Sequence, residues 1–379
     1  MAMINYITQI QFDYGATALL QQECNRISIQ RPFVVTDRGV RAAGIVDRVL
    51  AHLDASSQPA IYDKTPPNPN EAAVREAAAL YRDGGFDGII AIGGGSSIDL
   101  AKGVAICGTH DGPLKSFAVI EGGAARITAA TAPVIAIPTT AGTGSEVGRG
   151  AILILEDGRK VGVLSPHLVP KSAICDPELT LGLPPLMTAA TGMDALAHCL
   201  ETFMSPAFNP PADGIALDGL RRGWLHIERA TRDPQDRDAR LNMMSASMQG
   251  AMAFQKGLGC VHSLSHSLGG IDPRLHHGTL NAIFLPAVIA FNADCDSMRQ
   301  ESKLERIAQT MQLSGPDEIG PAIKAMSRRL ELPAGLGELG VTAAMFAKII
   351  DGALADHSHK TNPRDASADD YEWMLGQSL

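Results

Sequence analysis

Continuous runs of β-branched and other apolar residues alternate with helix-like segments through the first half of the chain. The runs are PFVVTD (32–37), AIYD (60–63), GIIAIGGG (88–95) and PVIAIPTT (133–140). Runs that are apolar throughout, rather than at every second position, are typical of parallel strands covered on both faces. Helical spacing predicts helices between them, over about 40–54, 71–84 and 97–107. Strand and helix in repetition predict a parallel sheet with right-handed crossovers.

Two further strands are predicted as a hairpin. AILIL (151–155) and KVGVL (160–164) flank EDGR, and Asp157-Gly158 suits the tight turn that a hairpin needs.

The pattern changes at DPELTLGLPP (176–185), after which strand-like runs stop and amphipathic helical periods begin. These periods cover about 186–203, 212–230, 236–255, 258–269, 278–292, 302–312 and 317–331. The pair Pro184–Pro185 marks a predicted hinge. The sequence therefore predicts an α/β domain over residues 1–184 and an all-α domain over residues 185–379.

Composition narrows the class of protein. The 379 residues are 45% hydrophobic and 19% charged, which is typical of a globular chain. A net charge of −9 argues against nucleic acid or an anionic membrane as the main partner, and every long apolar run is interrupted by Gly or Pro. MAMINYITQIQFDYG (1–15) lacks the pattern of a signal peptide, and six cysteines without a CxxC pair fit reduced thiols. We therefore expect a cytoplasmic protein.

Two glycine-rich segments follow predicted strands. AIGGGSSIDLAKG (91–103) opens a helix, where glycines let backbone N–H groups approach a pyrophosphate, although its spacing is not GxGxxG. IPTTAGTGSEV (137–147) adds hydroxyls and further glycines. Asp37 ends the first strong strand, where a carboxylate either accepts from a ribose hydroxyl or forms an Asx turn. Together these features favour a dinucleotide site over two unrelated turns.

Asp194 and His198 lie four residues apart in the otherwise apolar stretch ATGMDALAHCLETF (190–203). His262 and His266 repeat that spacing, and the pair His276–His277 follows shortly after them. One carboxylate with several imidazoles and no thiolate suits Fe(II) or Zn(II) in a mixed nitrogen and oxygen shell. A hydrogen-bonded pair on a core helix is the alternative for each HxxxH-like spacing taken singly.

Five motifs, in this order, resemble those of the iron-containing (group III) alcohol dehydrogenase family. They are GGGSSIDLAK (93–102), IPTTAGTGSEV (137–147), CDPELTLGLP (175–184), TGMDALAHCLE (191–201), and GLGCVHSLSHSLG with a later HHG (257–278). The resemblance covers nearly the whole chain. It implies an α/β N-terminal dinucleotide-binding domain with a parallel sheet and an all-α C-terminal domain that binds metal and substrate, the fold shared with dehydroquinate synthase.

The resemblance also implies roles for individual residues. Metal ligands would be Asp194, His198, His262 and His277, the last preferred to His276 because it directly precedes Gly278. His266 would be the catalytic residue that relays a proton to solvent. Cofactor contacts would come from Asp37, Asn68, Gly94, Gly95, Ser96, Asp99, Thr139, Thr140 and Lys160. Asp37 favours NAD over NADP because it repels a 2′-phosphate, although Arg38 is its neighbour. Family members are often dimers or larger, and we expect a homodimer or larger homo-oligomer.

The implied reaction is NAD-linked oxidation of an alcohol, or reduction of an aldehyde, with a divalent metal polarising the substrate oxygen. Arg149 and Lys256 lie in stretches that are otherwise apolar, so each needs a partner. That partner is either a carboxylate of the substrate or an internal acidic residue. Residues 205–220 and 356–367 resemble the 4-hydroxybutyrate dehydrogenases of the family, which interconvert 4-hydroxybutyrate and succinate semialdehyde with NAD.

Other functions are also compatible with parts of the sequence. A general short-chain alcohol, aldehyde or diol oxidoreductase would have no use for Lys256 and Arg149 as substrate contacts. Maleylacetate reductases generally lack the full metal set, and the metal shell of dehydroquinate synthase begins with Glu where this chain has Asp194. A non-enzymatic NAD sensor would require the metal cluster to be structural.

Overall fold

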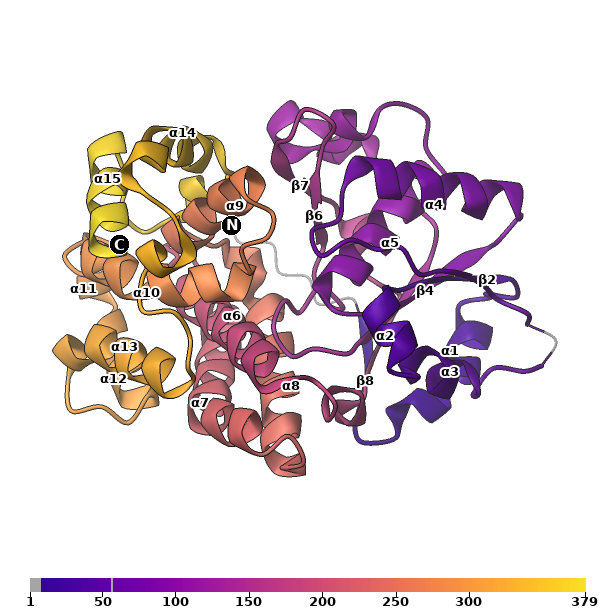
Figure 1. The fold of residues 1–379 in the computed structure, drawn as a ribbon, viewed down its shortest axis with the longest axis horizontal. Helices are drawn as coiled ribbons and strands as arrows, with labels where there is room; N and C mark the ends of the chain where they lie inside the picture. The colour runs from indigo at the N-terminus through magenta and orange to yellow at the C-terminus, as the bar shows by residue number, and fades with distance from the viewer. Residues whose placement is uncertain (1–7, 56) are drawn as a thin grey trace. The chain divides into compact units, whose positions relative to one another are not determined.

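The computed structural model describes residues 8–55 and 57–379 of the chain (Figure 1). Residues 1–7, on which the signal-peptide expectation partly rests, lie outside the described residues. The chain forms two compact units, one from residues 8–140 and 144–182 and the other from residues 141–143 and 183–379. From residue 183 to residue 379 the chain belongs to the second unit without interruption, and the predicted domain boundary at 184/185 lies close to this point. Within the described residues, no helix has both the length and the apolar character needed to cross a bilayer.

The first unit is built on a six-stranded sheet in the order β1-β8-β5-β4-β2-β3. Every pairing in it is parallel. The strands are β1 (Gln9–Phe12), β2 (Pro32–Val35), β3 (Ala60–Tyr62), β4 (Gly88–Gly93), β5 (Val134–Pro138) and β8 (Ser172–Cys175). The predicted α/β fold with a parallel sheet is confirmed. The sequence did not reveal β1 and β8, because QIQF is half polar and SAIC is short and made mostly of small residues.

Helices cover both faces of this sheet. The helices are α1 (Leu20–Arg26), α2 (Arg38–Ala42), α3 (Ile45–Leu50), α4 (Glu71–Asp83) and α5 (Gly95–Cys107). Side chains alternate along each strand, so Phe33 and Val35 pack with α4 and α5, whereas Val34 packs with α1 and α3. The predicted helix over 40–54 is interrupted at Gly44, which has a φ of 70° that favours glycine.

The predicted hairpin is present as β6 (Gly150–Ile154) and β7 (Lys160–Leu164), which pair antiparallel. Gly158 turns the chain between them with a φ of 83°, in the left-handed region that glycine adopts without steric cost. Ala151 and Leu153 of β6 point into the same core as α5.

The second unit is helical, and residues 183–379, all of them described, contain no strand. Its helices are α6 (Pro185–Met204), α7 (Pro210–Arg232), α8 (Arg237–Ala253), α9 (Cys260–Ile271), α10 (His277–Asn292), α11 (Asp296–Gln300), α12 (Lys303–Thr310), α13 (Ile319–Arg329), α14 (Phe346–Ala355) and α15 (Ala368–Gln377). The seven predicted periods correspond to α6–α10, α12 and α13. The sequence analysis did not identify α11, α14 or α15.

Two buried lysines cap the C-terminus of α6. Lys256 Nζ donates to the carbonyl of Phe203 at 3.3 Å, and Lys303 Nζ donates to the carbonyl of Ser205 at 3.0 Å. Lys256 also forms an ion pair with Asp213 of α7. A cation at a helix C-terminus satisfies carbonyls that have no intrahelical donor. Lys256 thus has the internal acidic partner that the sequence left open as one of two possibilities.

Candidate metal centre and nucleotide-binding edge

Helix α6 places Asp194 and His198 one turn apart, and both side chains are buried. Asp194 Oδ1 lies 3.6 Å from His198 Nε2. Because residues four apart in a helix share a face, both groups point to the same side of α6. An apolar helix buries a carboxylate at high cost unless that carboxylate is paired or binds a cation.

Two further imidazoles approach the same carboxylate oxygen from α9 and α10. His262 Nε2 lies 3.8 Å and His277 Nε2 lies 3.6 Å from Asp194 Oδ1. The rings of His198 and His262 are stacked with their centroids 4.5 Å apart. Tetrahedral coordination with bonds of roughly 2.0–2.2 Å places ligand atoms roughly 3.3–3.6 Å apart. The ligand atoms of Asp194, His198 and His262 lie within 4.8 Å of one another, a donor set that fits a divalent metal, and His277 stands beside them through its approach to Asp194.

Gly278 allows the start of α10 to approach α6 closely. A Cβ atom at this position would lie 2.0 Å from the carbonyl oxygen of Ala190. The absence of a side chain after His277 is therefore a packing requirement of the site. Gly278, which directly follows His277 in the sequence, is therefore needed for α10 to pack closely against α6.

Protonation states at this centre follow from burial and neighbouring charge. Burial lowers the pKa of His198 to about 4, so its imidazole is neutral at pH 7, as a metal ligand must be. Burial alone would raise the pKa of Asp194, but the imidazoles of His198, His277 and His262 bring it well below its usual range. An anionic carboxylate buried among imidazoles is an electrostatic arrangement that a cation stabilises.

Two side chains behind these four residues, Glu201 and Asn281, hold His262 and Asp194 in place. His262 Nδ1 donates to Glu201 Oε2 at 2.5 Å, and Glu201 Oε1 accepts the Val261 backbone N–H at 2.7 Å. Asn281 Nδ2 donates to Asp194 Oδ1 at 2.8 Å. The sequence analysis missed Glu201 and Asn281. Their spacing was the available signal, since Glu201 lies two helical turns after Asp194 and Asn281 one turn after His277.

His266 lies beside His262 and His277, but its hydrogen bond is to a carboxylate other than Asp194. Its ring stacks on that of His277 at a centroid distance of 5.3 Å and meets the ring of His262 edge-on at 5.7 Å. Its Nδ1 is bonded to Asp356 rather than to Asp194.

In the first unit, the strand order reverses direction between β2 and β4. The chain leaves β2 for β3 on one side and leaves β4 for β5 on the other. Ligands of open α/β sheets bind at such a switch point, outside the carboxyl ends of the strands. Asp37 follows β2 and Gly94 follows β4, so the predicted cofactor segment occupies this edge.

Glycine is required at this edge because a side chain on Gly93 would collide with Ser97. Gly93 has a φ of 154°, and a Cβ there would lie 2.5 Å from Ser97 Oγ. Gly94 is the N-cap of α5, so the first N–H groups of that helix are available to an anion. Thr139 follows β5 and donates its backbone N–H to the Gly93 carbonyl at 3.0 Å.

Most of the predicted cofactor residues make contacts within the first unit. Asp37 caps α2 by accepting the Val40 N–H at 3.0 Å, which is the Asx-type role left open above. Lys160 Nζ donates to Asn68 Oδ1 at 2.9 Å, and Ser96 Oγ donates to the carbonyl of Pro67. These contacts fix the four side chains of Asp37, Asn68, Ser96 and Lys160 within the first unit.

Asp99 and the nearby Lys102 are buried, and both form hydrogen bonds to the segment 145–152. Asp99 accepts from Ser145 Oγ at 2.5 Å and from the Ile152 N–H at 2.9 Å. Lys102 Nζ donates to Ser145 Oγ and to the carbonyls of Ser145, Gly148 and Gly150 at 2.7–2.9 Å. Burial lowers the pKa of Lys102 to about 8. The sequence analysis missed Lys102, although a lysine three residues after Asp99 in an apolar helix was a visible signal.

Arg149, the second basic residue considered for substrate binding, is exposed. Its side chain has no ion-pair partner among residues 8–55 and 57–379.

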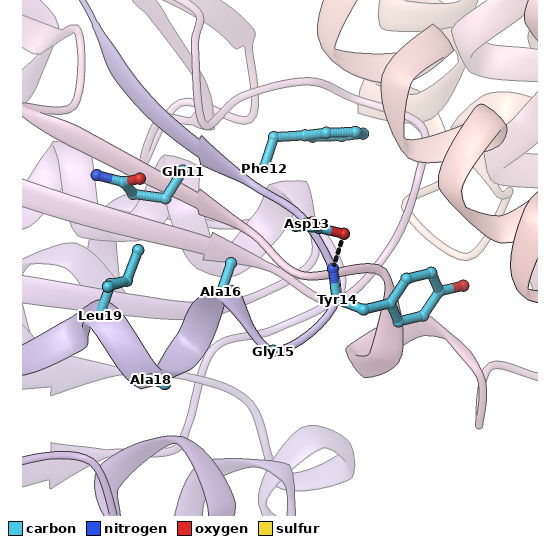
Figure 2. Close-up of a pocket in the computed structure, with 8 residues that line it drawn as sticks. All are labelled: Gln11, Phe12, Asp13, Tyr14, Gly15, Ala16, Ala18 and Leu19. Carbon is cyan, nitrogen blue, oxygen red and sulfur yellow. Dashed lines mark hydrogen bonds between the residues drawn. The ribbon is translucent and has the colours of Figure 1, made fainter.

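A hollow at the carboxyl end of β1 is lined by residues of the single stretch Gln11–Leu19 (Figure 2). The Tyr14 backbone N–H donates to Asp13 Oδ1 there at 2.8 Å. None of the predicted site residues lines this hollow.

Comparison with known proteins identifies the family. Residues 8–177 match the model of the iron-containing alcohol dehydrogenases, and residues 188–379 match that of the C-terminal region of the Fe-containing alcohol dehydrogenase family. The chain belongs to the iron-containing alcohol dehydrogenase family. It is therefore an oxidoreductase that acts on alcohols or the corresponding carbonyl compounds.

Relatives within this family match over the full chain. The 4-hydroxybutyrate dehydrogenase of Cupriavidus necator is 64% identical, with 100% of each chain covered. The 1,3-propanediol dehydrogenase of Klebsiella pneumoniae is 35% identical, with 97% of this chain and 96% of the relative covered. A crystal structure of 1,3-propanediol oxidoreductase superposes with a TM-score of 0.92 at 33% identity, covering 100% of both chains. Sulfoacetaldehyde reductase from Bifidobacterium kashiwanohense, in complex with NAD⁺, has a TM-score of 0.89 at 26% identity and covers 100% of this chain and 98% of that one.

Removing the charge of Glu201 tests whether it orients a ligand of this family's metal. We expect Glu201→Gln to lower the affinity for Zn(II) by about 10–100-fold, because His262 loses the anionic acceptor that fixes its ring. Competition with a chromophoric chelator measures this affinity. Glu305→Gln, an exposed change on α12, is the matched control and should leave it unchanged. Equal affinities for wild type and Glu201→Gln would mean that His262 is held in place without Glu201.

Proposed function

We propose that this enzyme interconverts 4-hydroxybutyrate, or a similar ω-hydroxy acid, and succinate semialdehyde, using NAD and a divalent metal. The observation that carries this proposal is the 64% identity over the full chain to a 4-hydroxybutyrate dehydrogenase. We further propose that it acts as a homodimer or larger homo-oligomer in the cytoplasm.

The proposed metal ligands are Asp194, His198, His262 and His277, and the proposed ion is Fe(II) or Zn(II). A metal held there supplies Lewis acidity toward the substrate oxygen. The protein residues fix the donor geometry, with Glu201 and Asn281 holding His262 and Asp194 in place. His266, whose ring packs against His277, is the proposed catalytic acid and base.

The proposed NAD site is the switch point between β2 and β4. The N-terminus of α5 would receive the pyrophosphate, and Asp37 would disfavour a 2′-phosphate. The complex of sulfoacetaldehyde reductase with NAD⁺ supports the choice of NAD. We propose that the remaining cofactor contacts come from the residues named in the sequence analysis, namely Asn68, Gly94, Gly95, Ser96, Asp99, Thr139, Thr140 and Lys160.

Arg149 and Lys256 are the proposed partners of a substrate carboxylate, and Arg149 is the better candidate of the two. Lys256 is buried and paired with Asp213, so releasing it for a substrate would leave a buried carboxylate unpaired. Arg149 is exposed, so a substrate carboxylate would not have to displace an internal partner.

Substrate preference tests the proposed function. We expect kcat/KM of the Fe(II)-loaded enzyme for succinate semialdehyde to exceed that for butyraldehyde by about 100-fold, a difference of roughly 3 kcal/mol in transition-state binding. The two aldehydes have equal chain length, so the ratio isolates recognition of the carboxylate. NADH oxidation measures both rates. A ratio near one would instead indicate a general alcohol or diol oxidoreductase, the alternative suggested by the 35% identity to 1,3-propanediol dehydrogenase.

A further inference from the structure

Asp356 is a buried carboxylate next to the proposed metal centre that neither the metal ligands nor the substrate contacts account for. It precedes the short 3-10 helix His357–Thr361 and is 8% exposed. His266 and His357 flank it, and the three side chains lie within the same helical unit.

Both oxygens of Asp356 are engaged in a defined way. Oδ1 accepts the backbone N–H of Ser358 at 2.8 Å. Oδ2 accepts from His266 Nδ1 at 3.0 Å, and His357 Nδ1 lies farther from Oδ2, at 3.6 Å. The bond from the backbone anchors the carboxylate, so its second oxygen is held toward His266.

Asp356 is anionic at neutral pH. Burial alone would raise its pKa, but the neighbouring His266 and His357 bring the pKa well below its usual range. An ionised carboxylate can only accept hydrogen bonds. The hydrogen bond from His266 therefore requires the proton of a neutral His266 to be on Nδ1, which leaves the lone pair on Nε2.

The position of His266 gives this tautomer a consequence for the reaction. Its ring lies parallel to that of His277, with an interplanar angle of 10°, and edge-on to that of His262. It is thus adjacent to two of the proposed metal ligands, where a substrate oxygen would be bound. A neutral imidazole can take up a proton there only through a nitrogen that carries none.

We propose that Asp356 is a positioning residue that holds His266 as the Nδ1–H tautomer, so that Nε2 receives the proton released by the substrate hydroxyl. The inference rests on the proposed function, since it requires His266 to serve as the catalytic acid and base. During oxidation the substrate O–H bond breaks and an Nε2–H bond forms, while the hydride passes to NAD⁺. During reduction the same proton returns from Nε2 to the oxygen of the product alcohol.

Asp356→Asn, in the metal-loaded full-length enzyme, tests the proposal. The amide oxygen can keep the Ser358 N–H, so the NH₂ group then faces His266 Nδ1 and favours the Nε2–H tautomer. We expect kcat to fall by about 10²–10⁴-fold, with KM for NADH and the bound metal both unchanged. Asp351→Asn is the matched control, because it makes the same carboxylate-to-amide change at an exposed position of α14; its kcat should stay within about 3-fold of wild type.

The tautomer can also be read directly, which keeps the test independent of whether Asp356→Asn folds. The ¹⁵N chemical shifts of the His266 ring in the zinc-loaded wild type should show the proton on Nδ1. A proton on Nε2 would overturn the proposal, as would a wild-type kcat in Asp356→Asn or a loss of activity that follows a loss of metal. A second zinc ion per wild-type chain that disappears in His357→Gln would also overturn it, by showing that the three groups bind a cation. All these measurements can use butyraldehyde, so a failure of the succinate semialdehyde preference would be seen separately in the wild type.

Discussion

Replacing His277 with alanine will remove the bound metal and lower kcat/KM by about 10³-fold or more. His277 Nε2 lies 3.6 Å from Asp194 Oδ1, and we propose it as the fourth metal ligand. Three protein ligands would hold the ion more weakly, and loss of the Lewis acid removes several kcal/mol of transition-state stabilisation. Metal content by atomic emission, together with NADH oxidation, measures both effects. Because the His277 side chain is partly exposed, the helical unit should remain folded by circular dichroism.

His276→Ala is the control, since it deletes the same side chain one position earlier. His276 is the N-cap residue of α10, whereas His277 is the first residue of the helix and its Nε2 lies 3.6 Å from Asp194 Oδ1. We expect His276→Ala to retain its metal. If His276→Ala loses the metal and His277→Ala keeps it, the assignment of the fourth ligand is wrong.

Replacing Lys102 with methionine will destabilise the first unit by about 3–5 kcal/mol. The ammonium group donates to four oxygens, three of them backbone carbonyls of residues 145–150. Methionine fills a similar volume but donates nothing, so these buried acceptors lose their donor. Asp99, which shares Ser145 with Lys102, also loses a nearby positive charge. Thermal unfolding should begin about 10 °C lower.

Lys115→Met is the matched control for this change. Lys115 is exposed and has only loose ion pairs, 3.8 Å from Asp157 and 3.9 Å from Glu121. Pairs of this kind contribute about 0–1 kcal/mol, so the melting temperature should hardly change. A small effect of Lys102→Met would mean that water replaces the ammonium group as the donor to residues 145–150.

Local patterns in the sequence were sufficient for most of the fold. Runs such as GIIAIGGG are apolar at every position because β4 is covered on both faces, and that property is visible without a structure. Strand β1 was missed for the converse reason, since it is an edge strand whose QIQF pattern is half polar. The break at Gly44 was also missed, because glycine in a helical period marks a break only when its φ is positive.

In the candidate site, too, some features could be predicted from the sequence and others could not. Asp194 and His198 share a helical turn, so their common direction could be predicted from spacing alone. The contacts between Glu201 and His262, and between Asp356 and His266, join residues 61 and 90 positions apart in the chain. No periodicity encodes such a contact, because it depends on how separate helices pack. The pairing of Lys256 with Asp213 is of this kind too, and a buried lysine in a sequence does not reveal which acid it contacts.

The proposed ligands all belong to α6, α9 and α10, and hence to one compact unit of the chain. Metal that binds only the folded form adds its binding free energy to the stability of that unit, about 2.7 kcal/mol when free metal is at 100 times its Kd. The supply of iron or zinc in the cell would thereby influence how long the protein survives, as well as how fast it turns over. In metal-starved cells the helical unit would open more often and be cleaved first by proteases.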